Sequence, residues 1–142
     1  MAYIASRGLI EVYDQANSTY VTIPLNLMRY EEYKVTPQQM IDLDSYVAET
    51  GQLIRNVLSH TRSKIEFNTP YITSTDWATL WGIISAGFIN TTERNVKIRY
   101  YNPFTDGYRV GTCYVPDVEF TVRNIDNGII NYDGIRVAFI EY

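Results

Sequence analysis

The sequence predicts a mainly β protein, an antiparallel β-sandwich or half-barrel with one α-helix packed on a sheet. Three observations predict this class. Short segments in which apolar and polar residues alternate recur along the chain, and clusters of Asn, Asp, Gly and Pro separate them. One stretch, at about 74–87, instead carries apolar residues at helical spacing. A chain of 142 residues suits one hydrophobic core, so we expect residues 1–142 to form a single domain.

The first predicted element is a β-hairpin near the N-terminus. Its strands are the runs 9–13 and 20–25, in which apolar and polar residues alternate. The residues between the two runs favour a turn: Asp14, Gln15, Asn17 and Ser18. Because Pro24 has no N–H group to donate to a neighbouring strand, we expect its strand to lie at a sheet edge or to end there.

Residues 33–58 are polar overall but contain spaced aromatic and aliphatic side chains. A structureless loop of this length is unusual in a compact domain, so we predict an extended arm or a long hairpin. Its apolar side chains would need a partner surface. We therefore predict an oligomer interface formed by Tyr33, Val35, Met40, Ile41, Leu43, Tyr46, Val47 and Leu53.

The predicted helix follows a short alternating strand at 64–67. The segment Thr73-Ser74-Thr75-Asp76 offers hydroxyl groups for the N-cap and an acid for the first turn. A stripe of large apolar side chains then recurs at helical spacing, and Gly87 suits its end. We interpret this stripe as a core helix and not as a ligand platform; its residues are Trp77, Leu80, Trp81 and Ile84.

The remaining third of the chain reads as further strands. Residues 96–101 and 108–114 alternate on either side of the turn Asn102-Pro103-Phe104-Thr105-Asp106-Gly107, which predicts a second hairpin. We expect another strand at 118–122, a turn-rich segment at 124–134 and a final strand at 135–142.

The inventory of reactive side chains favours a protein without catalytic, cofactor-binding or metal-binding residues. His60 is the one histidine, and adjacent residues of a strand face opposite ways, so Ser59 and His60 would form no dyad there. Cys113 is the one cysteine and lies in an apolar segment, as a small buried hydrophobe does. Asp42 and Asp44 would suit a calcium site or a glycosidase pair, but a solvated polar edge is the favoured interpretation.

Charge and hydropathy restrict the partners. The net charge of −4 argues against sequence-specific nucleic acid binding, which depends on clustered Lys and Arg. The sequence has neither a secretory signal nor an apolar run of about 20 residues, so we expect synthesis in the cytoplasm and no membrane partner. Tyr accounts for 13 residues, more than one small core needs, and Tyr is frequent at protein interfaces.

Several segments resemble a family of small tailed-bacteriophage structural proteins that have the tail-tube-like fold. The likeness is carried by a polar stretch that runs into a strand, by a tyrosine-rich strand with a Pro-containing turn and a second strand, and by a closing strand with a late Glu. These segments are 55–67, 97–107, 111–117 and 135–142.

The resemblance implies a twisted β-sandwich or half-barrel whose copies assemble side by side into a ring, commonly a hexamer. Members of the family lie in the virion tail, as tube, distal-tail or adaptor proteins, and contact other tail or baseplate proteins. The leading hypothesis is therefore a structural, non-enzymatic tail subunit. A binding module for a receptor or a carbohydrate is the alternative, and an enzyme that uses the acidic cluster is a third hypothesis.

Overall fold

An antiparallel sheet forms the body of the protein. The computed structural model describes residues 2–40, 46–55 and 61–142. Within them, eight strands form one sheet in the order β2-β1-β9-β10-β13-β6-β3, and β8 also pairs with β9. The strands are β1 (Ile10–Asp14), β2 (Thr19–Thr22), β3 (Lys34–Gln39), β6 (Arg62–Asn68), β8 (Phe88–Asn90), β9 (Asn95–Asn102), β10 (Gly107–Tyr114) and β13 (Arg136–Glu141). The predicted class, mainly antiparallel β with one α-helix, is confirmed.

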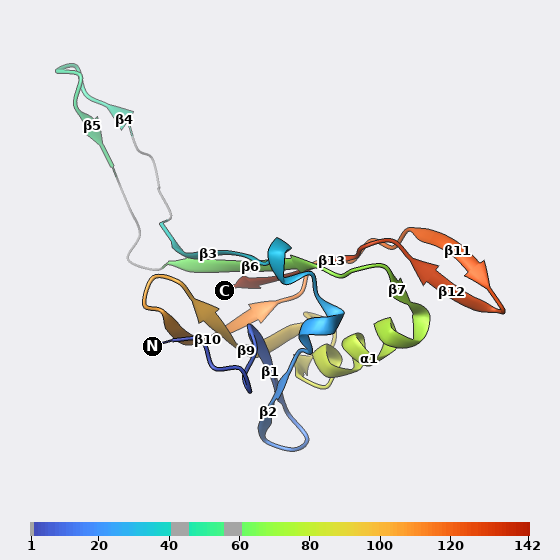
Figure 1. Ribbon diagram of the computed structural model, residues 1–142. Helices are drawn as coiled ribbons and strands as arrows, with labels where there is room; N and C mark the ends of the chain where they lie inside the picture. The colour runs from blue at the N-terminus through green and yellow to red at the C-terminus, as the bar shows by residue number, and fades with distance from the viewer. Residues whose placement is uncertain (1, 41–45, 56–60) are drawn as a thin grey trace.

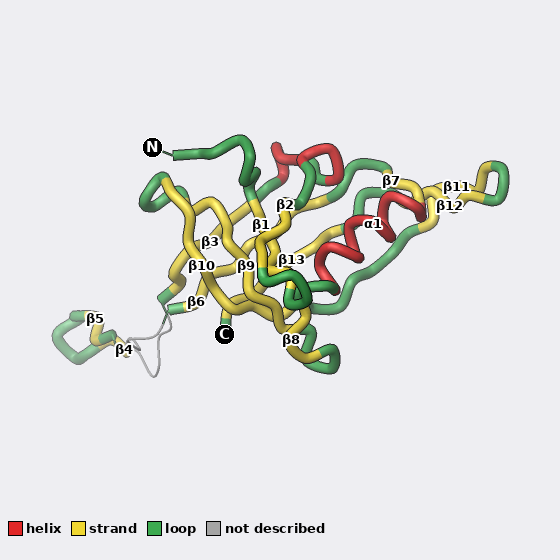
Figure 2. The backbone as a smooth tube through the Cα atoms, turned by 90° about the horizontal axis from the view of Figure 1, so that it is seen from below, coloured by secondary structure: helices red, strands yellow, loops and turns green. Residues whose placement is uncertain are grey.

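Two smaller ribbons leave this body at opposite ends (Figures 1 and 2). A three-stranded sheet consists of β7 (Ile72–Thr73), β12 (Ile129–Tyr132) and β11 (Val122–Asp126). At the other end, β4 (Tyr46–Val47) and β5 (Leu53–Ile54) form a separate hairpin. Two 3-10 turns, η1 (Leu25–Leu27) and η2 (Tyr30–Glu32), connect β2 to β3.

The core lies between the inner face of the large sheet and the helix α1 (Ser74–Ser85). Burial alternates along β6 and β9 with a period of two, because successive side chains of a strand point to opposite faces. Large fully buried side chains are Ile65 and Phe67 of β6, Ile98 and Tyr100 of β9, and Phe139 of β13. Burial of this apolar surface is the main favourable contribution to folding.

The helix begins where the sequence predicts and ends two residues earlier. The Thr73 hydroxyl accepts a hydrogen bond from the Asp76 N–H at 3.1 Å, which satisfies one of the free donors of the first turn. Leu80 and Ile84 are fully buried. Trp77 and Trp81 are half-buried and pack against the margin of the core.

Two predicted boundaries are wrong. Residues 115–121 form no strand, and the turn-rich segment 124–134 contains most of the β11–β12 hairpin. Asn127 and Gly128 at its tip both have positive φ, of 51° and 76°, which is the geometry of a tight hairpin turn. The arm also begins later than expected: Tyr33 and Val35 pack against the core, and residues 34–39 are a strand of the main sheet.

Other predicted elements are confirmed with small shifts. The first hairpin is β1–β2, and β2 lies at the edge of the sheet, with Pro24 just after its end. The second hairpin is β9–β10, which pairs Gly107 with Asn102 across the predicted turn. The closing strand is β13, and it lies inside the sheet between β10 and β6.

Gly82, within α1, and Gly87, just after its end, provide a matched test of this packing. A Cβ at Gly87 would lie 2.5 Å from Val12 Cγ1 and 2.9 Å from the Tyr13 carbonyl oxygen, whereas a Cβ at Gly82 meets nothing within 4 Å. We expect Gly87→Ala to lower the free energy of unfolding by about 1–3 kcal/mol, because the core has no room. Gly82→Ala should raise it by about 0.5–1 kcal/mol through helix propensity. Urea unfolding followed by circular dichroism measures both, and equal effects would contradict the packing described.

Candidate functional site

The described residues offer several exposed surfaces and depressions. Among them, no three His, Cys, Asp or Glu side chains come together as metal ligands would. No helix in the described ranges has the length and apolar character needed to cross a membrane. Asp42, Asp44, Ser59 and His60, which the sequence singled out, lie outside the described residues. The candidate functional surfaces are an exposed hairpin, a buried polar cluster and depressions in the surface.

The β4–β5 hairpin presents apolar side chains to solvent. Tyr46 pairs with Ile54 and Val47 with Leu53, and the Ala48 N–H donates to the Gln52 carbonyl oxygen at 2.7 Å to close the turn. The side chains of Met40, Tyr46, Val47 and Leu53 are all more than half exposed. Ile41 and Leu43, also predicted at the interface, lie outside the described residues. An isolated two-stranded ribbon is marginally stable in water, so a covering surface would stabilise this one.

A buried polar cluster holds the end of β3 from which the arm continues. Ser63 of β6 is fully buried, and its hydroxyl oxygen accepts hydrogen bonds from the Tyr100 hydroxyl at 2.8 Å and from the Gln38 N–H at 3.0 Å. The Ser63 N–H donates to Glu141 Oε1 at 3.0 Å. Gln38 has a φ of 50° and lies in an irregularity of the β3–β6 pairing. These bonds fix a strained backbone position at the end of β3.

Burial raises the pKa of two weakly acidic groups at this cluster, the Tyr100 hydroxyl and the Cys113 thiol. It raises the pKa of the Tyr100 hydroxyl, and the hydrogen bond to Ser63 opposes this only in part. It also raises the pKa of the Cys113 thiol to about 12, and the nearby Glu141 carboxylate acts in the same direction. Tyr100 is therefore a hydrogen-bond donor at neutral pH, and Cys113 is an inert thiol, as the sequence indicated.

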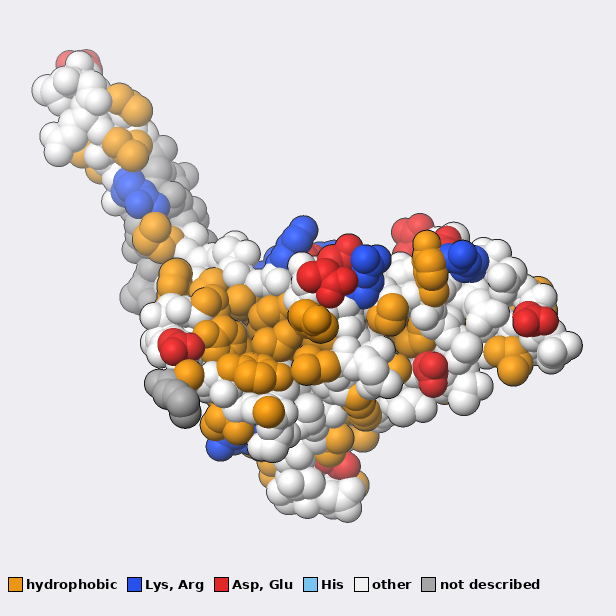
Figure 3. Space-filling model, in the orientation of Figure 1, with side chains coloured by type: hydrophobic (Ala, Val, Ile, Leu, Met, Phe, Trp, Pro, Cys, Tyr) orange, Lys and Arg blue, Asp and Glu red, His pale blue; other side chains and the backbone are white. Residues whose placement is uncertain are grey.

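An apolar groove, here named the tyrosine groove, lies on the face shown in Figure 3. The Tyr33 hydroxyl, from the residue before β3, donates to the carbonyl oxygen of Tyr101 in β9 at 3.0 Å. The Tyr101 ring packs edge-on against Tyr3 and Tyr108, with centroids 6.4 and 6.1 Å away. The groove has a volume of about 540 Å³ and is lined by Leu9, Tyr30, Tyr33, Lys34, Val35, Tyr101 and Pro103.

A second groove, of about 340 Å³, lies beside α1. The rings of Trp77 and Trp81 stack with centroids 5.8 Å apart, and Phe120 packs edge-on against Trp77 at 5.1 Å. Arg94 and Asp117 form an ion pair at its rim. The two Trp side chains thus contact the core on one side and this groove on the other. Sequence reasoning missed the groove because it placed Phe120 in a strand.

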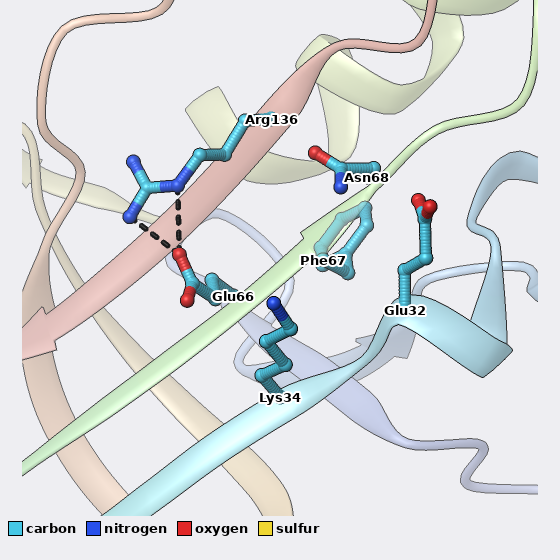
Figure 4. Close-up of a pocket in the computed structure, with 6 residues that line it drawn as sticks. All are labelled: Glu32, Lys34, Glu66, Phe67, Asn68 and Arg136. Atoms are coloured by element: carbon cyan, nitrogen blue, oxygen red, sulfur yellow. Dashed lines mark hydrogen bonds and ion pairs between the residues drawn. The ribbon is translucent and has the colours of Figure 1, made fainter.

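The third depression is charged, and Figure 4 shows its lining. Arg136 of β13 contacts Glu66 of β6 through Nε, 2.7 Å from Oε2, and Lys34 of β3 lies on the same side of the sheet. The Arg136 side chain is about half exposed, so the ion pair adds little stability. The depression has a volume of about 140 Å³, and two of its charged residues, Arg136 and Glu66, are paired with each other.

Residues 12–142 match a sequence model whose description is "Family of unknown function (DUF6711)". The chain belongs to the DUF6711 family. No curated protein matches it.

Two solved structures share the fold of this DUF6711 protein. One is "Tail of empty GTA particle computed with helical refinement, C6 symmetry", with a TM-score of 0.53 and 16% identity over 99% of this chain and 95% of that chain. The other is "Virion of native gene transfer agent (GTA) particle", with a TM-score of 0.50 and 15% identity, again over 99% of this chain and 95% of that chain. The fold is thus one that occurs in a phage-like tail, and the predicted tail-tube-like fold is confirmed.

The Ser63 cluster can be tested by a double-mutant cycle. Ser63→Ala should lower the free energy of unfolding by about 1–3 kcal/mol, because the Tyr100 hydroxyl and the Gln38 N–H lose their buried acceptor. Tyr100→Phe should then cost less in the Ser63→Ala background than in the wild type. Urea unfolding of the four proteins gives the coupling energy. Additive losses would show that the hydroxyl groups do not interact.

The Cys113 thiol should react slowly while the protein is folded. With a pKa of about 12, only on the order of one thiol in ten thousand is ionised at pH 8, and the side chain is fully buried. We expect iodoacetamide to alkylate the folded protein at least about 100-fold more slowly than the urea-unfolded chain. Mass spectrometry over time measures both rates, and similar rates would mean that Cys113 is accessible.

Proposed function

We propose that the protein is a structural, non-enzymatic subunit of a phage-like tail and that its copies assemble into a ring. The observation that carries this proposal is the fold shared over 99% of the chain with a protein of a gene transfer agent tail. That tail has C6 symmetry, which supports a ring of six copies. The ring would lie in the virion tail, as part of the tube, the distal end or an adaptor, after synthesis in the host cytoplasm.

The surfaces of the molecule support an assembling subunit. The apolar side chains of Tyr46, Val47 and Leu53 are exposed on a ribbon that has little contact with the body. The edge strands β2 and β3 each have one free side within the described sheet. Exposed apolar patches and free strand edges are sites where proteins associate. Besides its own copies, the ring would contact other tail or baseplate proteins, and neither sequence-specific nucleic acid nor a membrane is among the proposed partners.

We assign the arm the role of contacting a neighbouring copy. Tyr46, Val47 and Leu53, with Met40 at the end of β3, would bury their apolar surface there. Ile41 and Leu43 remain predicted members of this interface. Tyr33 and Val35 would take part through the tyrosine groove and not through the arm, since they pack beside the core.

Replacement of the arm tests the proposal. Gln39 and Arg62 are cross-strand partners, so residues 40–61 can be replaced by Asn-Gly, which closes a two-residue hairpin between β3 and β6. We expect this variant to keep the β circular-dichroism signal and to be monomeric by multi-angle light scattering at concentrations where the wild type forms rings. A second variant keeps the arm and changes its three exposed apolar residues, Tyr46, Val47 and Leu53, to Ser. It should also weaken assembly, because the apolar surface of the arm is lost while its length is kept.

The mass of the wild-type protein, measured by light scattering, decides between a tail subunit and a binding module. A ring mass near six subunits supports the tail subunit, whereas a stable monomer at high concentration would contradict it and favour a binding module. If the arm-replacement variant still formed rings, the assembly would stand and the role of the arm would be wrong.

A further inference from the structure

The β11–β12 hairpin leaves the body at one end of the molecule (Figures 1 and 2), whereas the tyrosine groove is lined by residues of the body itself. We propose that the β11–β12 hairpin of one copy docks into the tyrosine groove of the next copy. This contact rests on the proposed function, and it names the two surfaces that would join neighbouring subunits within a ring.

The hairpin has more exposed apolar surface than its own fold can cover. The side chains of Val122, Ile125 and Ile129 are 53%, 67% and 45% exposed. Only the base of the hairpin is tied to another strand, because β12 pairs with β7 through Asn131 and Tyr132 alone. All five residues of β11 are exposed, and β11 is an edge strand in the described sheet. A ribbon of this kind favours a partner that covers both its apolar side chains and its open edge.

The tyrosine groove offers an apolar floor and a neighbouring strand edge, which match the exposed side chains and the open edge of the hairpin. Its floor is apolar, with Leu9, Val35 and the rings of Tyr33 and Tyr101. It runs beside β3, which is the other edge strand of the large sheet. Tyr30 stands at its rim and is 65% exposed, and Tyr is a side chain that often anchors protein interfaces.

The charges at the two surfaces are complementary. Lys34 lines the groove, and no ion pair joins it to another described residue. Asp126 ends β11 beside the hairpin tip and has no described ion partner either. Arg123, the other charge on β11, lies over the Tyr71 ring at 3.7 Å and is already engaged. Lys34 also lies beside Glu66 in the charged depression (Figure 4), and a contact that brings Asp126 to it would add a second acid next to this amine and set the register of the hairpin in the groove.

The placement of the surfaces fits a ring. Two different patches on a subunit make a head-to-tail contact, which closes into a ring when the rotation between copies is right. The β4–β5 hairpin leaves the body at the end opposite to the β11–β12 hairpin (Figures 1 and 2). The β11–β12 hairpin points away from that end and toward the next copy.

A cysteine pair tests the contact directly in the full chain. A variant that carries both Ile125→Cys and Tyr30→Cys should form a ladder of covalent multimers under mild oxidation, visible on a non-reducing gel. Each single variant should form none beyond the level of the wild type. The buried Cys113 stays in place, because its raised pKa keeps it out of the exchange. The pair Tyr46→Cys with Tyr30→Cys tests the other candidate occupant, the β4–β5 hairpin.

Charge reversal provides an independent measurement. Lys34→Glu or Asp126→Lys alone should raise the concentration needed for half-assembly by about tenfold, the size expected for one lost and one repulsive charge contact. The double variant should restore assembly to within about threefold of the wild type. Glu119→Lys, an equal change of an exposed acid outside the hairpin, is the control and should leave assembly unchanged.

The outcomes separate this contact from the proposed function. If the wild type forms rings but the Ile125–Tyr30 pair gives no ladder, or if the Tyr46–Tyr30 pair gives one in its place, the docking is wrong and the tail subunit stands. A failure of the double charge variant to recover would also overturn the docking. A wild type that remains monomeric would overturn both.

Discussion

The fold depends on the junction that β13 makes between two groups of strands. Strands β2, β1, β9 and β10 lie on one side of β13, and β6 and β3 lie on the other. The pairing with β6 extends over five register pairs, whereas the pairing with β10 has only Cys113 with Glu141 and Tyr114 with Ile140. The Glu141 side chain extends the pairing of β13 with β6, because its carboxylate accepts the Ser63 N–H beyond the last β6 pair. Gly111 makes room for that carboxylate, since a Cβ there would lie 2.5 Å from Oε2.

The same junction links the core to the assembly surfaces. Ser63, held by Glu141, accepts the N–H of Gln38 and so fixes the irregular end of β3. The arm continues from that end, and the tyrosine groove lies along the same strand. The buried polar groups thus define geometry more than they add stability, a role that such groups have in several proteins.

The accuracy of the sequence predictions follows from how local each signal is. The strands of β1–β2 and β9–β10 and the helix were predicted because one face of each is buried, which imposes a period of two or of 3.6 on the sequence. The β11–β12 hairpin was missed because both of its faces are largely exposed, and no burial pattern marks it. The Asn127-Gly128 pair was a usable hairpin signal. Strand β3 was assigned to the arm because residues 33–58 are polar overall and carry only spaced apolar side chains.

The sequence by itself determined the strand-rich class and the position of the helix. These properties depend on residue identity and on the spacing of apolar residues within a short segment of the chain. Only the tertiary structure decided that Trp77 and Trp81 border a groove, that Tyr33 and Val35 belong beside the core, and that Ser63, Tyr100 and Glu141 meet. Those contacts join residues that are far apart along the chain, and register and sheet order, which local patterns do not encode, bring them together.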